Sequence, residues 1–292
     1  EGPLDLKALA RALNVVVARH APLRTTLHLE EASGRLLQRV HARAPTEFRA
    51  DGDLTPSVVV DRALDAAVTA FCEARFDVAQ APLLRARVFV PTSATFATEP
   101  AEQRHVVAIV AHHAALDGFG ASLLLRELRD SYAGRLLRRV PRAFSAFVRD
   151  EAARLAGVQA QAAEAFWVEE LKNASLAVFD TKPPNPATSS APAIVTDRID
   201  LAIDGELYAA IEAWRKRPET ACTLLTTLLA SLMFTMHRLT NYQTSRFVRS
   251  LSVSIVADLC CSSDLCLGLI HANREEPGAA DTIGYFANTT LL

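Results

Sequence analysis

Residues 112–118, which read His-His-Ala-Ala-Leu-Asp-Gly, contain the side chains best suited to chemistry in this chain. Histidine titrates near neutral pH, so His112 or His113 can accept and return a proton during a group transfer. The carboxylate of Asp117 can fix the local geometry, and Gly118 lets a backbone N–H approach a substrate closely. These residue types at this spacing indicate a proton-transfer site. Two ordinary histidines at the end of a strand are the alternative.

The flanking sequence places these residues between a strand and a helix. Residues 104–111 form a short β-branched run that is typical of a buried strand, and residues 121–132 carry apolar side chains at helical spacing. The histidines are therefore expected at the C-terminal end of the strand, with Gly118 near the helix N-terminus. The backbone N–H groups there have no partner within the helix and suit a developing negative charge.

The segment has the form HHxxxDG, which resembles the signature motif of nonribosomal peptide synthetase condensation domains and their acyltransferase relatives. Further segments resemble motifs of the same family, in the family's order and over nearly the whole chain. They are Arg19–Leu27 (RHxxLRTxF), Phe76-Asp77 with Ala81–Ala86 (FDL and PLLRA), Phe166-Trp167 with Leu171 (YWxxxL), Gly268–Arg274 (GxxxxxR) and Ile283–Thr289 (IGxFxNT). On these motifs the chain is identified as a member of that family.

The resemblance implies a mixed α/β protein with the two-lobed fold of chloramphenicol acetyltransferase, here with an incomplete second lobe. The family's first strand would precede residue 1, and much of its second half would follow residue 292. The active site would lie in a tunnel between the lobes. Peptidyl or acyl carrier proteins of adjacent synthetase modules would dock at its two mouths, each presenting a thioester on a phosphopantetheine arm. The chain would bind no cofactor directly.

The resemblance also implies a reaction and roles for the residues of HHxxxDG. The α-amine of the acceptor would attack the donor thioester, and the peptide would grow by one residue. His113 would orient the amine or accept its proton, while His112 would fix the loop. The N–H of Gly118 would donate to the thioester oxyanion. Because a thioester is already activated, proximity would provide much of the acceleration.

Other residues are expected to support this segment. The resemblance pairs Asp117 with Arg274 as a charge pair that joins the two lobes, and it places Asn288 beside the tunnel. The alternatives are that Asp117 caps the following helix, that Arg274 is a solvated charge at a strand end, and that Asn288 is a turn residue. The sequence departs from the family's pattern at Gly120, where a serine is common.

A proline-rich segment divides the chain into two predicted lobes. Residues 181–193 contain four prolines among small polar residues and are predicted to be an extended linker. Residues 1–180 form the N-terminal lobe with HHxxxDG, and residues 194–292 form a partial C-terminal lobe. Residues 244–263 fit no element of the family and look like an insertion. Helices are expected at 4–20, 58–75, 144–171 with a break near Gly157, 205–216 behind Asp204 as N-cap, and, buried, 223–239; strands are expected at 23–29, 35–40, 83–90, 104–111 and 194–201.

Composition narrows the classes of function. The chain has 292 residues, a net charge of −2 and 50% hydrophobic residues. It has no dense basic stripe, so nucleic acid is not an expected partner, and its apolar runs are too short or too interrupted to span a membrane. Cys260, Cys261 and Cys266 cluster without the spacing of a zinc site. We therefore expect reduced cysteines, no metal and a cytoplasmic location.

Several functions are compatible with these residues. The first is an amide-forming condensation domain. The second is a stand-alone acyltransferase that moves an acyl group from coenzyme A to an alcohol or amine, but the IGYFANT segment favours the condensation domain. The third is a catalytically silent module that only docks carrier proteins, and the intact His113 argues against it. An epimerisation domain, which shares the histidine pair, is a minor option.

Overall fold

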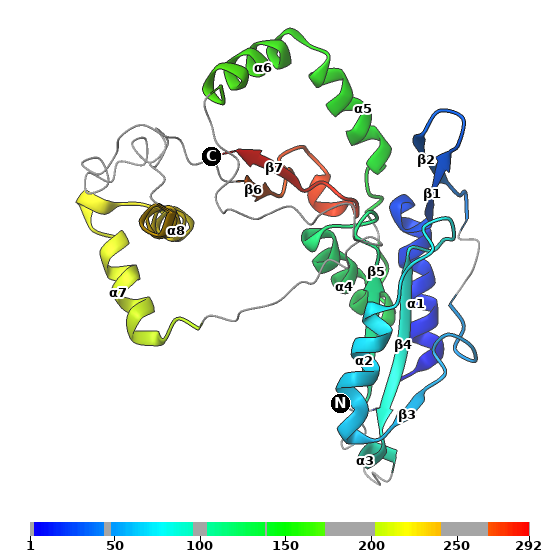
Figure 1. Cartoon of the computed structure of the whole chain (residues 1–292). Helices are drawn as coiled ribbons and strands as arrows, with labels where there is room; N and C mark the ends of the chain where they lie inside the picture. The colour runs from blue at the N-terminus through cyan, green and yellow to red at the C-terminus, as the bar shows by residue number, and fades with distance from the viewer. Residues whose placement is uncertain are drawn as a thin grey trace, which may run out of the picture. The chain divides into compact units, whose positions relative to one another are not determined.

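The structure, a computed structural model, describes residues 3–43, 48–95, 104–137, 139–172, 202–240 and 268–291 (Figure 1). The chain divides into two compact units, residues 1–157 with 270–288 and residues 158–269 with 289–292. The segment 270–288 thus belongs to the same unit as the HHxxxDG loop. The predicted linker 181–193, the strand 194–201 and the segment 244–263 lie outside the described residues, and the predicted lobe boundaries stay predictions.

A three-stranded sheet organises the first unit. β3 (Ser57–Val59) runs parallel to β4 (Leu84–Pro91), and β5 (Val106–Ala111) runs antiparallel to β4. Leu84 at the start of β4 lies opposite Ala111 at the end of β5. The C-terminal end of β5, where the histidines follow, is therefore fixed by pairing with the central strand.

One face of β4 contributes to the main hydrophobic core. Leu84, Ala86 and Val88 are buried there because alternate residues of a strand point to the same side. α1 (Leu6–Arg19) and α4 (Gly118–Tyr132) pack against each other and complete this core. α1 supplies buried side chains at helical spacing, namely Leu9, Ala10, Ala12, Leu13, Val16 and Val17.

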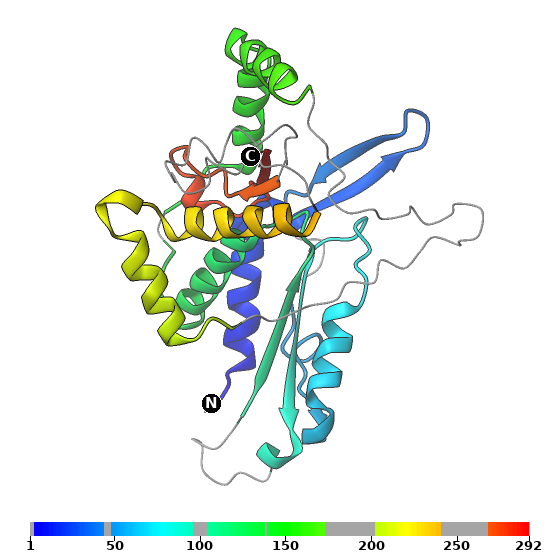
Figure 2. The same ribbon diagram turned by 60° about the vertical axis from the view of Figure 1, so that its left-hand side comes forward.

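α2 (Leu64–Glu73) packs against the other face of the sheet, so that α1 and α2 lie on opposite sides of the strands (Figure 2). Phe71 of α2 meets Phe89 of β4 edge to face, with ring centroids 6.0 Å apart. The guanidinium of Arg85 lies over the Phe76 ring, 4.3 Å from its centroid. It also donates to carbonyls at the end of α2, which have no partner inside the helix.

The predicted helix over residues 58–75 is wrong in its first part. Residues 57–59 form β3, Asp61–Ala63 form a 3₁₀ turn, and α2 begins only at Leu64. The β-branched run Val58–Val60 favours an extended conformation, and pairing with β4 gives its backbone hydrogen-bond partners that the helical pattern did not reveal.

The strands expected at 23–29 and 35–40 are present and form a hairpin. β1 (Thr25–Glu30) pairs antiparallel with β2 (Arg35–Val40), and a 3₁₀ turn at Ala21–Arg24 leads into β1. The turn between the strands ends at Gly34, whose φ of +66° lies in the left-handed region that glycine adopts readily. The short helix α3 (Thr92–Thr95) follows β4.

α5 (Phe144–Leu155) packs on the segment 270–288 within the first unit. Phe147 of α5 forms a small buried cluster with Ala279 and Phe286. A 3₁₀ turn at Ala279–Asp281 lies in the same segment. This packing brings the GxxxxxR and IGxFxNT motifs to the HHxxxDG loop.

The second unit contains α6 (Val158–Glu170), α7 (Gly205–Arg215), a 3₁₀ turn (Pro218–Thr220) and α8 (Leu224–Thr240), together with the outer ends of β6 (Gly268–His271) and β7 (Asn288–Leu291), which pair with each other. The predicted break near Gly157 and the Asp204 cap are confirmed, since Asp204 accepts from the Leu207 N–H at 2.7 Å.

The prediction that the helix over 223–239 is buried is wrong for the part that can be described. Among residues 224–235 of α8, Met233 alone is buried. Burial depends on which elements pack around a helix, and apolar composition does not supply them. Across the described ranges of the chain, no helix combines the length and apolar composition needed to cross a membrane.

Candidate active site

The HHxxxDG segment forms the connection between β5 and α4. The His112 N–H donates to the Leu83 carbonyl at 3.0 Å, which continues the sheet pairing one residue beyond β5. The Ala115 N–H then donates to the His112 carbonyl at 2.9 Å and closes a turn. α4 begins at Gly118. The predicted placement of the histidines at a strand end, just before a helix, is confirmed.

His113 is exposed and is held by one ring nitrogen. Its Nδ1 lies 2.9 Å from the Leu116 carbonyl. A carbonyl oxygen can only accept, so Nδ1 carries the proton and the neutral ring presents the lone pair of Nε2. The ring also meets the Tyr285 ring edge to face, with centroids 5.2 Å apart. His113 therefore has a fixed tautomer and a fixed ring orientation.

His112 is half-buried and its contacts are local. Its Nδ1 accepts from the Ala114 N–H at 3.1 Å, and its ring meets Phe76 edge to face, with centroids 5.8 Å apart. Because Nδ1 accepts from the loop backbone, the neutral ring carries its proton on Nε2. These contacts hold the loop, in keeping with the supporting role expected for His112.

Asp117 is 4% exposed, and both of its carboxylate oxygens accept hydrogen bonds. Oδ1 accepts from the Gly120 N–H at 2.7 Å and from Arg274 Nη2 at 2.8 Å. Oδ2 accepts from the Phe286 N–H at 3.0 Å and the Ala287 N–H at 3.2 Å. Burial by itself raises the pKa of the Asp117 carboxyl. The hydrogen bonds from the Gly120 N–H, Arg274 and the Phe286 N–H outweigh it, so the pKa lies below its usual value.

The side chain of Arg274 is 5% exposed, so it is not a solvated charge at a strand end. Besides Asp117, its guanidinium donates to the carbonyls of Ala279 (2.6 Å) and Thr282 (2.9 Å). It also lies 4.2 Å from the centroid of the Phe286 ring. The expected Asp117–Arg274 contact is present, and so is the cap on α4. Asp117 makes both contacts at once, within one compact unit.

The two glycines near the start of α4 have different surroundings. A Cβ built on Gly118 would meet nothing within 4 Å, so the position where a side chain would begin is open. A Cβ on Gly120 would lie 3.1 Å from Leu116 Cβ and 3.3 Å from Asp117 Oδ1. Gly120, which stands where the family commonly has serine, therefore lets the first turn of α4 lie close to Asp117, the residue that caps this helix.

Asn288 lies at the first position of β7, where it is exposed and lines a pocket with Tyr285 and Phe286. It is a strand residue at this position. Its expected place beside a substrate tunnel stays a prediction.

His20 is buried beside the site, and its partner there is one that none of the motifs indicates. His20 Nε2 lies 2.8 Å from Glu127 Oε2, and its Nδ1 accepts from the Ile283 N–H at 3.3 Å. Arg19 Nε lies 3.1 Å from the same Glu127 carboxylate. Burial raises the pKa of Glu127, but its contacts with His20 and Arg19 outweigh burial and lower it. The sequence offered one signal for this contact. Glu127 lies on the buried face of α4 with Leu124 and Leu128, where a charged residue needs a partner.

The described parts of the chain hold no group of three or more His, Cys, Asp or Glu side chains that could bind a metal ion. Cys72 and Cys222 are free thiols. Cys260, Cys261 and Cys266 lie outside the described residues.

The sequence profile of the condensation domain family matches residues 1–292. The chain belongs to the condensation domain family. The family expected from the motifs is therefore confirmed. Condensation domains are acyltransferase-type, amide-forming domains, which is the enzyme class expected from the motifs.

Curated relatives are large synthetases. The chain is 27% identical over 305 residues to a nonribosomal peptide synthetase of Penicillium thymicola and 28% identical over 312 residues to a linear gramicidin synthase of Brevibacillus parabrevis. Each match covers 100% of this chain, but only 9% and 5% of the respective relatives. This chain therefore corresponds to a small portion of these proteins.

Solved structures show the same fold. The SgcC5 protein from Streptomyces globisporus matches with a TM-score of 0.71 at 21% identity, over 100% of this chain and 59% of that one. The first condensation domain of the calcium-dependent antibiotic synthetase matches with a TM-score of 0.70 at 17% identity, over 100% and 61%. The expected mixed α/β, chloramphenicol acetyltransferase-like fold is confirmed, and this chain spans about three-fifths of each of these two chains.

Proposed function

We propose that this chain contributes the catalytic loop of a condensation domain that joins two thioester-bound substrates through an amide bond. The hydrogen bond from His113 Nδ1 to the Leu116 carbonyl is the observation that carries the proposal. It leaves Nε2 of an exposed ring as the proton acceptor, which is the form that a general base needs.

The reaction needs a proton acceptor and a donor for the carbonyl oxygen, and this loop can provide both. The acceptor enters with a free α-amine, whose pKa near 8 leaves a reactive fraction at neutral pH. Its nitrogen attacks the donor's thioester carbon while His113 Nε2 orients the amine and takes its proton. The C–N bond forms, the C–S bond breaks, and the proton passes from His113 to the departing thiolate. Gly118 is exposed and begins α4, where backbone N–H groups have no partner within the helix, so its N–H suits the carbonyl oxygen as it gains charge.

Asp117 and Arg274 act as positioning residues in this proposal. Each carboxylate oxygen of Asp117 already accepts two hydrogen bonds from the protein. Asp117 therefore has no part in proton transfer. It ties the start of α4 to the backbone of residues 286–287. Tyr285, next to that tie, contacts the His113 ring.

The expected partners are peptidyl or acyl carrier proteins and the adjacent modules of a synthetase. The relatives are multi-domain synthetases, which supports this expectation. The phosphopantetheine arms belong to the carrier proteins and arrive with the substrates. In the alternative, a stand-alone acyltransferase, coenzyme A would take the place of the donor arm.

The test uses the full-length parent protein, with donor and acceptor thioesters loaded on carrier proteins. Wild type should form a dipeptidyl thioester, and the His113→Ala variant should form it about 100-fold more slowly or worse. His271→Ala is the matched control, because His271 is exposed and pairs only with Glu275 among the described ion pairs. It should keep the wild-type rate.

Equal rates in wild type and His113→Ala would remove the proton-transfer role and leave proximity to carry the reaction. No product from the carrier-bound pair, together with transfer from an acyl-coenzyme A to an alcohol, would replace the proposal by the stand-alone acyltransferase. Binding of carrier proteins without either reaction would support the silent docking module.

A further inference from the structure

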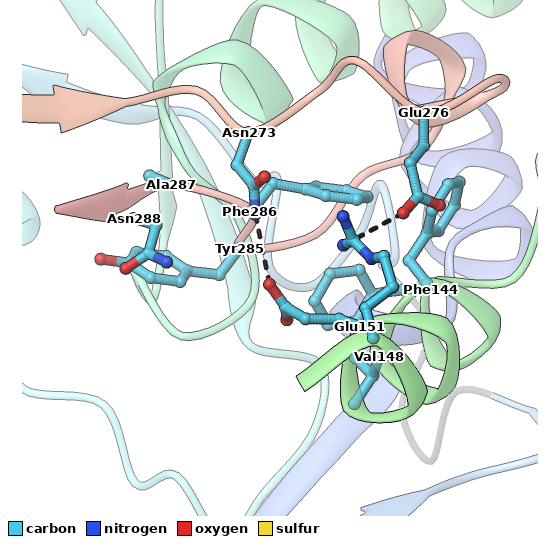
Figure 3. A pocket seen from close by; sticks show the side chains of 11 residues that line it. Phe144, Val148, Glu151, Asn273, Glu276, Tyr285, Phe286, Ala287 and Asn288 are labelled. Atoms are coloured by element: carbon cyan, nitrogen blue, oxygen red, sulfur yellow. Dashed lines mark hydrogen bonds and ion pairs between the residues drawn. The ribbon is translucent and has the colours of Figure 1, made fainter. Parts of the chain in front are cut away.

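A cavity of about 260 Å³ lies between α5 and the segment 273–288, within the first compact unit (Figure 3). Its apolar wall is made by the rings of Phe144, Phe147, Tyr285 and Phe286. Its polar side chains are those of Glu151, Arg154, Asn273, Glu276 and Asn288. Pockets for whole drug-sized ligands measure roughly 300–1,000 Å³, so this cavity suits a single side chain better than an entire thioester substrate.

Tyr285 connects the cavity to the catalytic loop. It lines the cavity, and its ring centroid lies 5.2 Å from that of His113. One side chain therefore separates the cavity from the imidazole. A substituent on an amino acid whose reacting group lies at His113 needs to extend only past Tyr285 to enter it.

The polar end of the cavity has an unbalanced negative charge. Glu276 already pairs with Arg154 at 3.1 Å and with Arg142 at 3.4 Å. Among the described residues, no ion pair engages Glu151. Its Oε1 accepts only a long hydrogen bond from Asn273 Nδ2, at 3.4 Å. Figure 3 shows Glu151 reaching from α5 toward Asn273 across the cavity.

This arrangement matches one class of side chain. A half-buried carboxylate has several acceptor sites and gains most from a cationic donor. The aromatic wall can pack against the methylene groups of a long side chain. Three of the rings pack together, since Phe286 meets both Phe144 and Phe147 edge to face at 5.0 and 5.1 Å. An acidic side chain would meet the uncompensated charge of Glu151.

We propose that this cavity binds the side chain of a thioester-bound amino acid that ends in a cationic group, as lysine does, with Glu151 as its counter-charge. The inference rests on the proposed amide-forming function and names the substrate class of the same site. The cationic side chain belongs either to the donor or to the acceptor, and the experiment separates the two.

The experiment uses the full-length parent protein and carrier proteins loaded directly with aminoacyl groups, so that loading imposes no selectivity. Lysyl, norleucyl and glutamyl groups are compared at the acceptor position opposite a norleucyl donor, and then at the donor position opposite a norleucyl acceptor. In one of these two arms wild type should prefer lysyl to norleucyl by about 10-fold or more, because a charged hydrogen bond is gained. Glutamyl should be slowest in that arm.

The Glu151→Gln variant should reduce the lysyl preference to about 3-fold or less, since Gln keeps the size but not the charge. Glu275→Gln is the matched control, because Glu275 is exposed, pairs with His271 and is not among the cavity's lining residues. It should keep the preference. The wild-type ranking tests the inference independently of how either variant folds.

Two results would overturn the inference but leave the proposed function intact. One is equal lysyl and norleucyl rates in both arms, and the other is a lysyl preference that Glu151→Gln does not change. Failure to form any dipeptidyl product from any pair would instead remove the proposed function, and this inference with it.

Discussion

His113 and Asp117 stand four residues apart in one loop, and the protein holds them in opposite ways. His113 is exposed, with one hydrogen bond to the nearby Leu116 carbonyl. Asp117 is buried and receives hydrogen bonds from α4, from Arg274 and from the backbone of residues 286–287. The exposed residue is available to a substrate, whereas the buried one holds the frame that the substrate meets. Stability and activity should therefore separate when the two are changed.

The Asp117→Asn substitution should have the largest effect on folding. It removes a buried charge and leaves Arg274 without its counter-charge, which costs about 3–5 kcal/mol. Thermal unfolding of the full-length protein should show a marked drop in melting temperature, accompanied by loss of activity. Asp281→Asn is the control, because Asp281 pairs with the exposed side chains of Arg126 and Arg139 and should cost at most about 1 kcal/mol. Equal effects of the two variants would contradict the contrast.

The His113→Ala substitution should have the reverse profile. The loss of about 100-fold in rate described above corresponds to about 2.7 kcal/mol in activation free energy. Its melting temperature should stay close to that of wild type, because an exposed side chain with one local hydrogen bond contributes roughly 0.5 kcal/mol or less. A large drop in melting temperature would show that His113 also holds the frame.

The His20→Ala substitution tests a second set of buried hydrogen bonds, those of His20 with Glu127 and Ile283. It leaves the Ile283 N–H without its partner and the Glu127 carboxylate with Arg19 alone, at about 1–3 kcal/mol. The melting temperature should fall by less than for Asp117→Asn. His20→Gln, which offers an amide in place of the ring, should recover part of the loss. If the melting temperature of His20→Ala equals that of wild type, the hydrogen bonds of His20 do not stabilise the fold.

A smaller effect should separate the two glycines. An alanine at Gly120 requires Leu116 and the Asp117 carboxylate to shift by a few tenths of an ångström, at about 1 kcal/mol. An alanine at Gly118 meets open space and should leave the melting temperature unchanged or slightly raised. If the Gly118→Ala variant is less stable than the Gly120→Ala variant, the close contacts at position 120 are not the reason for its glycine.

The Asp117 pair should also respond to acid in a defined direction. The pKa of Asp117 is lower in the folded protein than its usual value near 3.9, so the unfolded state binds more protons in that range. Its contribution to stability is complete above about pH 4 and is lost as the pH falls through the lower folded pKa. The difference in melting temperature between wild type and Asp117→Asn should shrink on acidification. A constant difference down to pH 3 would contradict this.

The local parts of the site could be predicted from sequence because their signals are local. The β-branched run before His112 and the apolar spacing after Gly118 are each contained in one short stretch of chain, and both elements are present. The Asp117–Arg274 contact came from the family's motifs, since no periodicity links residues 157 positions apart.

The remaining features depend on tertiary neighbours. His20 lies 107 positions from Glu127, and only the polar residue on the buried face of α4 hinted at a partner. The strand over 57–59 was hidden because the helical pattern of α2 can be extended back over it, and its pairing with β4 is a tertiary contact. Tyr285 occupies a position that the motif leaves open, and packing alone brings its ring to His113.

The ties between the loop and the segment 282–287 set the time at which the site can form during synthesis. Asp117 accepts from the Phe286 N–H across 169 positions, and His20 from the Ile283 N–H across 263. A ribosome adding roughly 5–20 residues per second needs about 8–34 seconds to pass from Asp117 to Phe286. Throughout that interval the carboxylate lacks most of its partners, so the start of α4 must remain accessible to water. The catalytic loop is translated early and reaches its folded geometry only when the later motifs emerge.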